Sequence, residues 1–332
     1  MKLAALVITH NSERHVAACL AACLRWREQF PAGILVIDNA SRDGTCARAE
    51  AFPEVRLVRN GENRGFAGAV NQGFRLLGDA DAVLILNPDV ELISSPEPLA
   101  RALEETPGAG AAGGLLLGRN GKPQRGFVFR RLPDATALCL EILGVNRLWP
   151  GNPANRRWRA LDLPYDRPAR SIQPPGACLL IRREAWGAVE GFDEAFHPVW
   201  FEDVDFICRL LEAGRDTVYT PAFRAVHEGG HSVLRLPWDD RQLYWYRNLL
   251  RYVSRHFRLS GRVLACLSVI AGLCPRVVTG MLVSRSLGPL RIYGRLVRLA
   301  VRTAVSPAER ACAPRPVDNL RDPVRAPGRP GI

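Results

Sequence analysis

Four short runs rich in apolar residues recur in the first 90 residues, at 3–8, 34–37, 55–58 and 83–86; all but 55–58, which contains Arg56, are unbroken, and polar, turn-forming residues follow each of them. Unbroken apolar runs of this kind are typical of parallel strands that are covered on both faces. Helical segments alternate with them, so the order predicts a right-handed, doubly wound α/β fold around a mostly parallel sheet. The polar loops then gather at the carboxyl edge of the sheet, where ligands bind in open α/β folds.

The fourth run ends in Asn87-Pro88-Asp89. Pro88 has no amide hydrogen for a sheet ladder, so the strand should stop there and leave Asp89 at its carboxyl end. A carboxylate at that edge suits Mg²⁺, which commonly binds one or two carboxylates together with phosphate oxygens. An aspartate in a strand-ending turn is also common without a ligand. This stretch alone leaves both interpretations open.

The two common phosphate-binding motifs are absent from the sequence. Gly65, Gly68 and Gly73 do not have the dinucleotide spacing G-x-G-x-x-G. A P-loop ending at Gly121-Lys122 would need glycine where Leu116 stands. A nucleotide would therefore have to be held by the strand-end loops and a metal ion.

The middle of the chain predicts two more strands, at 108–117 and 175–183. Between them, residues 118–173 are rich in proline, arginine and tryptophan. A connection this long predicts an insertion that either shapes the pocket of a second substrate or merely covers the sheet.

An acidic cluster opens a helix predicted from Trp200 to about Glu212. Glu202, Asp203 and Asp205 lie in its first turn, where carboxylates are favoured by the helix dipole. The functional alternative is a general base whose pKa is set by aromatic neighbours that limit solvent.

His227-Glu228-Gly229-Gly230-His231 matches the zinc peptidase pattern H-E-x-x-H. That pattern requires a helix, and two glycines in a helix interior cost about 1 kcal/mol each. The preceding residues predict a strand and turn around Pro221 instead. A zinc peptidase is therefore rejected, and His227 is either structural or a partner of Asp89 in a metal site.

The nine cysteines are odd in number and scattered, with no C-x-x-C pair, which predicts free thiols in a reducing compartment. The N-terminal apolar stretch, 3–8, is too short for a signal peptide and has no small-residue cleavage site. We therefore expect a cytoplasmic protein.

The net charge of +12 is concentrated in one segment. No acidic residue lies between Asp240 and Glu309, whereas twelve arginines do. This asymmetry predicts two modules, a main domain over 1–240 and a basic helical module over 241–305. Residues 306–332 are rich in proline with few apolar residues, which predicts a disordered tail.

The basic module predicts amphipathic helices. Residues 242–257 carry apolar side chains at helical spacing, and 263–284 are apolar over about the span of a bilayer, interrupted by Pro275 and Arg276. An arginine near a bilayer centre costs about 2.5–3.5 kcal/mol. We expect helices that lie on or dip into an anionic membrane face. The alternative is a helical cap on the catalytic domain or a partner; nucleic acid is not expected, because no recognised motif accompanies the charge.

The motifs follow one another in a fixed order: 7–12, 36–44, 63–68 with Asn71 and Gly73, 86–89, 176–183, 191–194, 201–205 and 227–232. In this order they resemble family 2 glycosyltransferases of the glycosyltransferase-A fold, and most of all the rhamnosyltransferase-like branch. The resemblance covers about residues 3–257.

The resemblance implies a donor site for a nucleoside-diphosphate sugar. Asp38 would read the base edge. The donor-site residues that it implies are Thr9, Asn11 and Asp38 toward the nucleoside, Asn63, Gly65 and Asn71 on the diphosphate side, and Asn87 in the same site.

The resemblance also implies the chemistry. Asp89 and His227 would hold Mg²⁺ or Mn²⁺, which neutralises the departing nucleoside diphosphate. Asp203 would take the proton from an acceptor hydroxyl that attacks the anomeric carbon in line and inverts it. The residues expected to border the acceptor or donor sugar are Gly176, Trp200 and Glu202.

One departure concerns the metal. The family often has Asp-x-Asp, whereas this chain has Asn87-Pro88-Asp89, a form frequent in the rhamnosyltransferase-like branch. A single carboxylate lowers the expected metal affinity and leaves the identity of the metal open.

The expected function is an inverting, metal-dependent hexosyltransferase at the inner face of the cell membrane. It would move a sugar, such as rhamnose, to a hydroxyl of a lipid-linked or polysaccharide glycan in cell-surface glycan synthesis. The alternatives are a different hexose donor, or a non-catalytic scaffold protein that binds nucleotide sugars.

Overall fold

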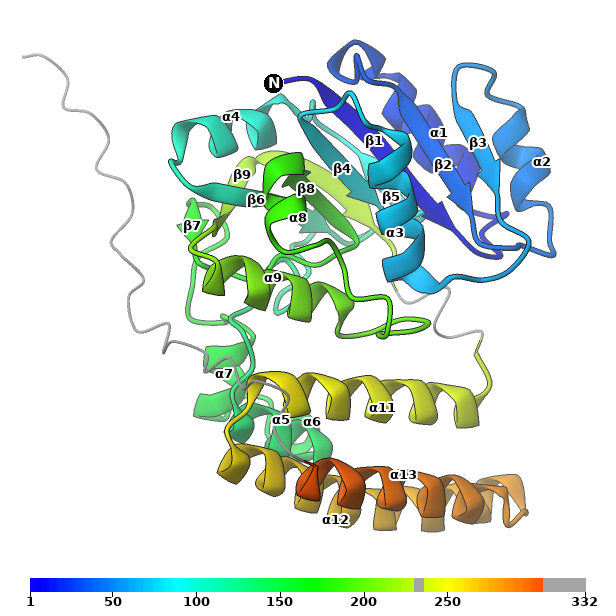
Figure 1. Ribbon diagram of the computed structural model, residues 1–332, viewed down its shortest axis with the longest axis vertical. Coiled ribbons are helices and arrows are strands. Elements are labelled where there is room, and N and C mark those ends of the chain that lie inside the picture. The colour runs from blue at the N-terminus through cyan, green and yellow to red at the C-terminus, as the bar shows by residue number, and fades with distance from the viewer. Residues whose placement is uncertain (230–235, 307–332) are drawn as a thin grey trace, which may run out of the picture.

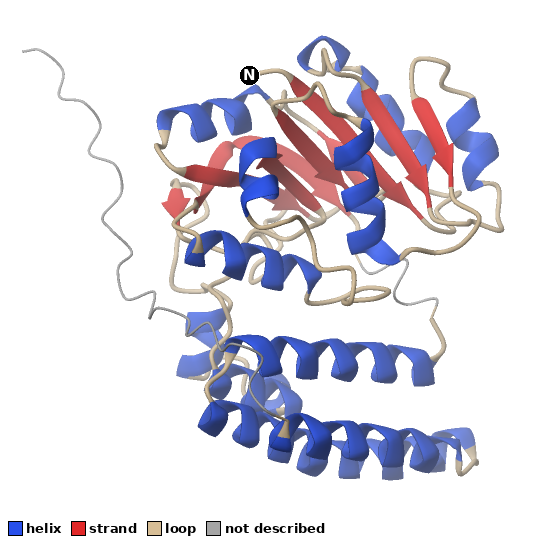
Figure 2. Cartoon of the chain, viewed as in Figure 1, coloured by secondary structure: helices blue, strands red, loops and turns tan. Residues whose placement is uncertain are grey.

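The computed structural model describes residues 1–229 and 236–306, apart from the side chains of 283 and 284. A twisted sheet with helices on both faces forms the upper part of the molecule in Figure 1. Long helices from the C-terminal part lie below it as a separate layer, as the helix and strand colouring of Figure 2 makes plain. The segments 230–235 and 307–332 lie outside the described residues, and with them nearly all of the predicted tail.

The N-terminal half of the sheet is parallel. It is built from β1 (Leu3–Thr9), β2 (Ile34–Asp38), β3 (Arg56–Arg59) and β4 (Ala82–Leu86) in the spatial order β3-β2-β1-β4. Side chains of β1, β2 and β4 are buried along their whole length, as unbroken apolar runs require when helices cover both faces. The predicted α/β fold is thus confirmed.

The second half of the sheet is mixed. β8 (Cys178–Arg182) lies antiparallel between β4 and β6 (Ala109–Leu117). β9 (Asp216–His227) is parallel to β6 and antiparallel to the short β5 (Val90–Leu92), and β7 (Ala169–Arg170) pairs with β9 at the side. An apolar run does not encode the direction in which its strand will pair, so this mixture was not readable from the pattern.

Helices cover the two faces of the sheet. α1 (Val16–Leu24) and α4 (Glu97–Glu105) pack on one face, and α3 (Gly65–Leu76), α8 (Arg183–Ala188) and α9 (Glu202–Glu212) pack on the other. α2 (Thr45–Glu50) lies beside β2 and β3, and a 3₁₀ turn spans Arg27–Gln29.

The insertion does more than cover the sheet. It forms α5 (Ala135–Ile142), α6 (Val145–Leu148) and α7 (Pro153–Trp158). Leu138 and Ile142 belong to a third hydrophobic core, together with Phe196, Phe201 and side chains of the C-terminal helices.

The C-terminal layer consists of α11 (Trp238–His256), α12 (Leu259–Ser284) and α13 (Gly288–Val305). α11 begins before the predicted domain boundary at 240/241, and its inner face is buried in the third core. α12 continues through Pro275, and Arg276 hydrogen-bonds the carbonyl of Ile142 on α5. The layer is therefore packed on the rest of the protein.

Candidate active site

The carboxyl ends of β1 and β2 bring Thr9 and Asp38 together. Thr9 Oγ1 donates to Asp38 Oδ1 at 2.8 Å, and the Ser41 amide donates to Asp38 Oδ2 at 2.9 Å. Both Thr9 and Asp38 are buried. Burial, and then its contact with Asp38, raises the pKa of the Cys46 thiol to about 11. The hydrogen bonds from Thr9 and Ser41 hold the Asp38 carboxylate in one orientation at the carboxyl edge of the sheet.

Asn11 links the loops that follow the same two strands. Its amide donates to Ser41 Oγ at 2.8 Å, and its Oδ1 accepts from the Arg42 amide at 2.8 Å. Its φ of 51° is a left-handed conformation that asparagine tolerates better than most residues. Thr9, Asn11 and Asp38 therefore lie together, as the sequence predicts.

The turn before α3 depends on Gly65. Its φ is +72°, and a Cβ there would lie 2.8 Å from His197 Cδ2 and 3.1 Å from the Pro198 carbonyl oxygen. Asn63 Oδ1 accepts from the Gly65 amide at 2.8 Å, and Phe66 N donates to the Pro198 carbonyl at 2.9 Å. Only glycine fits this close approach of two loops.

Asn71 is buried, and its amide is engaged within the protein. Its Nδ2 donates to Phe192 O at 2.8 Å and Glu194 Oε1 at 3.0 Å, and its Oδ1 accepts from Phe192 N at 2.9 Å and Trp186 Nε1 at 3.2 Å. Both donors and both acceptor positions of this amide are used. These contacts give Asn71 a structural role, because they join α3 to the turn at 191–194.

Asp89 and His227 meet at the edge of the sheet. β5 pairs with β9 so that Val90 lies opposite His227, which brings the preceding Asp89 beside the imidazole. Asp89 Oδ1 and His227 Nε2 are 3.7 Å apart, and the two side chains are 7% and 5% exposed. The Gly229 amide donates to Asp89 Oδ2 at 3.1 Å. His227 ends a strand rather than lying on a helix, and His231 lies outside the described residues.

Gln124, from the insertion, fixes the tautomer of His227. Its Nε2 donates to the His227 carbonyl at 2.7 Å, so its Oε1 faces His227 Nδ1 at 2.9 Å. Nδ1 must then carry the proton, which leaves the lone pair on Nε2. Burial lowers the pKa of His227 against the opposing effect of Asp89, and Phe127 stacks on the ring at 5.0 Å.

This donor set fits a divalent cation. Oxygen and imidazole ligands of Mg²⁺-sized ions lie about 2.1 Å from the metal, so two ligand atoms of one ion can be up to about 4.2 Å apart. The 3.7 Å between Asp89 Oδ1 and His227 Nε2 is within that limit. A neutral imidazole with its second nitrogen hydrogen-bonded is also the form in which histidine binds metals.

Asp203 lies in the first turn of α9 and faces the loop before β8. Its Oδ2 accepts from the Gly176 amide at 2.9 Å and from Gln173 Nε2 at 3.3 Å, and its Oδ1 accepts from its neighbour Val204 at 2.8 Å. A Cβ at Gly176 would lie 3.1 Å from Asp203 Cβ. The loop connects two parts of the site, because Asn87 N donates to the carbonyl of Ala177 at 2.8 Å.

Glu202 and Trp200 flank the start of α9. Glu202 is buried, and desolvation, then the nearby Asp203, raises its carboxyl pKa well above the ordinary value. Its Oε2 has no hydrogen-bond partner among the described residues. Trp200 and Phe201 are consecutive residues at φ +79° and +69°. The helix therefore starts from a strained turn, with a buried carboxyl of raised pKa beside Asp203.

A second group of metal-ligand types lies on the other side of α9. Atoms of Cys208, Glu212 and His256 lie within 4.8 Å of one another. His256 Nδ1 is 3.3 Å from Cys208 Sγ, and its Nε2 is 2.8 Å from Asp205 Oδ1. Both ring nitrogens thus have protein partners, and the group joins α9 to α11.

Comparison with known proteins agrees with this geometry. A family model described as "Glycosyl transferase family 2" matches residues 4–159. The curated "N-acetylglucosaminyl-diphospho-decaprenol L-rhamnosyltransferase" of Mycobacterium tuberculosis is 32% identical over 280 residues, which are 76% of this chain and 89% of that protein.

Solved structures show the same fold at low identity. S. aureus TarS (residues 1–349), solved with UDP-GlcNAc, aligns at a TM-score of 0.54 and 14% identity over 92% of this chain and 82% of TarS. A mannosyltransferase from Pyrobaculum calidifontis, solved with GDP-Man and Mn²⁺, aligns at 0.52 and 15% over 91% and 86%. The predicted glycosyltransferase-A fold is confirmed.

Proposed function

Because this chain belongs to glycosyl transferase family 2 and resembles its rhamnosyltransferases, we propose that it transfers rhamnose from a nucleoside-diphosphate sugar to a hydroxyl of a lipid-linked glycan. The acceptor class follows the name of the M. tuberculosis relative, which acts on an N-acetylglucosaminyl-diphospho lipid. The observation that carries the proposal is the 176–177 loop, which hydrogen-bonds Asp203 through Gly176 and the end of β4 through Ala177. In this proposal, the loop brings Asp203, as the base, to the same edge of the sheet as Asp89 and His227, as the metal ligands.

The donor would lie along the carboxyl ends of β1, β2 and β4. Thr9, Asn11 and Asp38 face the nucleoside in this proposal, with Asp38 fixed by Thr9 and Ser41. Asn63 and Gly65 lie at the N-terminus of α3, where amide groups and the helix dipole favour a diphosphate. Asn87 borders the same region, and Asn71 supports it from behind through its four hydrogen bonds.

Asp89 and His227 would hold Mg²⁺ or Mn²⁺. When bound, the ion supplies positive charge that neutralises the departing nucleoside diphosphate. Gln124 keeps the lone pair of His227 on Nε2 and directs it toward Asp89.

Asp203 would act as the general base. Its carboxylate accepts the proton of the acceptor hydroxyl while that oxygen bonds to the anomeric carbon and the bond to the diphosphate oxygen breaks. One displacement of this kind inverts the anomeric centre. Gly176 allows the loop to approach Asp203, and the buried Glu202 stays protonated beside it.

We further propose that α12 and α13 rest on the inner face of the cell membrane. Among the described residues of α12 after Gly261, every exposed side chain is uncharged, and these side chains lie along one side of the helix. They are Leu264, Leu267, Ala271, Cys274, Pro275, Val278, Thr279 and Leu282. The stretch Leu259–Leu282 is long and apolar enough to cross a bilayer by length and composition. Its contact with α5 through Gly272 and Arg276 favours lying on the surface.

The exposed face of α13 supplies positive charge that would attract an anionic membrane. Arg291, Arg295, Arg298 and Arg302 recur at helical spacing and are exposed. Each such arginine near an anionic leaflet contributes about 1 kcal/mol of membrane attraction. In Figure 1, α12 and α13 form the layer farthest from the sheet, where a membrane could reach them without covering it.

Thermal stabilisation by a panel of nucleotide sugars, with and without Mn²⁺ or Mg²⁺, tests the proposal. A ligand that binds only the folded state raises the melting temperature. We expect a metal-dependent rise that is selective for one nucleoside diphosphate and lost in Asp89→Ala. A rise with a different sugar would replace rhamnose as the donor, and no rise with any donor would contradict the proposed donor site.

A further inference from the structure

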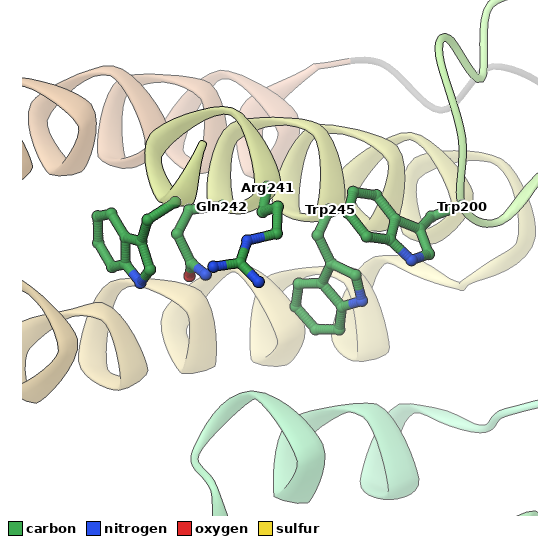
Figure 3. Close-up of a pocket in the computed structure, with 5 residues that line it drawn as sticks. Trp200, Arg241, Gln242 and Trp245 are labelled. Atoms are coloured by element: carbon green, nitrogen blue, oxygen red, sulfur yellow. The ribbon is translucent and has the colours of Figure 1, made fainter. Parts of the chain in front are cut away.

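A pocket of about 380 Å³ opens between the loop before α9 and the first two turns of α11. It is lined by Trp200, Trp238, Arg241, Gln242 and Trp245. Figure 3 shows the guanidinium of Arg241 between Gln242 and Trp245, with Trp200 at one end. Three indoles around one cation are an unusual lining for a surface pocket.

The strained turn before α9 presents Trp200 to this pocket. Two consecutive residues other than glycine at positive φ are unfavourable, and such strain persists only where surrounding contacts maintain it. Phe201 is buried and contacts Trp245 and Tyr252, with ring centroids 6.0 and 5.7 Å away. The reversal of the chain thus places one aromatic ring in the core and its neighbour in the pocket.

α11 also holds the loop itself. Asn248 Nδ2 donates to the carbonyl of Val199 at 2.8 Å, and Arg247 donates to the carbonyl of His197. Both wall elements of the pocket are therefore fixed to each other before any ligand arrives.

The lining has a specific chemistry. Arg241 has no ion pair within the part of the chain that the structure describes, and its buried Nε has no hydrogen-bond partner there. A guanidinium binds phosphate oxygens in a bidentate manner. Indole faces pack against the apolar faces of sugar rings, and the Gln242 amide can hydrogen-bond hydroxyls. A saccharide joined to a phosphate suits the guanidinium, the indoles and the amide of this lining.

We propose that this pocket binds the phosphorylated saccharide of the acceptor, with Arg241 on the phosphate and the indoles against the sugar. The proposal rests on the function proposed above. Trp200 lies three residues before Asp203, so the pocket adjoins the loop that leads into the proposed base. Trp238 lies against α12 at Gly280, and the exposed Val278 and Leu282 on the adjoining turns of α12 offer an apolar surface for the attached lipid.

Arg241→Gln tests the pocket by acceptor kinetics. Two acceptors are compared, a saccharide diphosphate with a short alkyl chain and the same saccharide as a neutral alkyl glycoside. We expect the KM for the diphosphate acceptor to rise about tenfold or more, as loss of a charge-assisted hydrogen bond implies. The KM values for the neutral glycoside and the donor should stay unchanged. Arg241→Lys should give a smaller rise.

Arg27→Gln removes one exposed arginine from the 3₁₀ turn and serves as the control. Equal KM changes for both acceptors, or a change in the KM for the donor alone, would overturn the assignment. A thermal unfolding curve of each variant separates loss of binding from loss of fold.

A binding measurement separates this proposal from the proposed function. If no donor supports transfer by the wild type, the proposed function fails, and quenching of tryptophan fluorescence by the saccharide diphosphate decides the pocket alone. Quenching in the wild type but not in Arg241→Gln supports the pocket. No quenching in the wild type overturns it.

Discussion

His256 on α11 places Nε2 2.8 Å from Oδ1 of Asp205 on α9, which joins the last turn of one helix to the first turn of the other. Asp205 is fully buried and also accepts from Arg209 at 2.8 Å. Burial lowers the pKa of His256, but its hydrogen bonds with Asp205, Cys208 and Glu212 outweigh that effect and raise it to about 11. The helix that carries the proposed base is thus tied to the C-terminal layer by a charged imidazole.

His256→Gln should therefore lower the free energy of unfolding by about 3 kcal/mol near neutral pH, since it leaves a buried carboxylate short of a partner. The pKa of folded His256 lies above its ordinary value, so its stabilisation is complete below about pH 6.5 and is lost as pH rises toward 11. Urea unfolding should show that the difference in stability between the variant and the wild type is smaller at about pH 10 than at about pH 7. Arg258→Gln, an exposed residue two positions further on at the N-cap of α12, should change little, and an equal loss there would contradict the assignment.

Gln124→Ala should weaken metal binding about 10- to 100-fold, the usual effect of removing a hydrogen-bond partner of a metal-binding histidine. The tautomer of His227 is then no longer fixed, because Gln124 Oε1 is its Nδ1 partner. Titration of Mn²⁺ followed by thermal stabilisation measures this without any turnover. The exposed Lys122→Ala serves as control, and wild-type Mn²⁺ affinity in Gln124→Ala would show that His227 is not a ligand.

Asp203→Asn should lower kcat about 10²- to 10⁴-fold while donor binding stays intact, because an amide keeps the hydrogen bond from Gly176 but accepts no proton. Glu202→Gln is the matched comparison. Burial keeps Glu202 protonated, so an amide of the same shape should cost much less. Similar losses of kcat in both variants would remove Asp203 as the base.

Gly65→Ala should destabilise the turn before α3 by about 1–2 kcal/mol from its left-handed backbone alone, with a further cost from the contact with His197. The stabilisation by donor nucleotide should fall with it. Gly61→Ala, where a Cβ meets nothing within 4 Å, is the control for unfolding in urea. A Gly65→Ala protein as stable as Gly61→Ala would mean that this loop packs differently.

Replacing Arg295 and Arg298 together with glutamine should reduce flotation on anionic vesicles about 30-fold in partition coefficient, at about 1 kcal/mol for each arginine. Neutral vesicles should show no difference between variant and wild type. The control pair, Arg27→Gln with Arg101→Gln, removes two exposed charges from other parts of the surface. Equal flotation of all three proteins would exclude α13 from the membrane contact.

Asp38 and Asp89 could be placed from the sequence because each directly follows an apolar run, and parallel strands end at one edge. From the residues alone, the contact of His227 with Asp89 was one of two alternatives, and the resemblance favoured it. It depends on the antiparallel register of β5 and β9, which is set by tertiary packing between distant segments. Gln124 carries no local signal at all, since it lies in an insertion whose path follows no periodic pattern.

The domain boundary shows a different limit. Charge changes sharply at Asp240, and this change predicts two modules. The hydrophobic core is not divided where the charge changes, because the inner face of α11 contributes Tyr246, Leu249 and Val253 to a core shared with Leu138 of the insertion. Asn71 shows the same limit at the scale of one residue, since only the structure reveals that its amide is already saturated.

The shared third core has a consequence for how such a chain can be altered. Phe196 and Phe201 from the catalytic part, Ile142 from the insertion and Leu250 from α11 are packed together, so no cut near residue 240 leaves two complete hydrophobic interiors. A shortened chain would expose this surface and self-associate rather than remain a free catalytic unit. Because the core is shared, replacing the C-terminal helices with those of a distant relative would also require a matching change in the insertion.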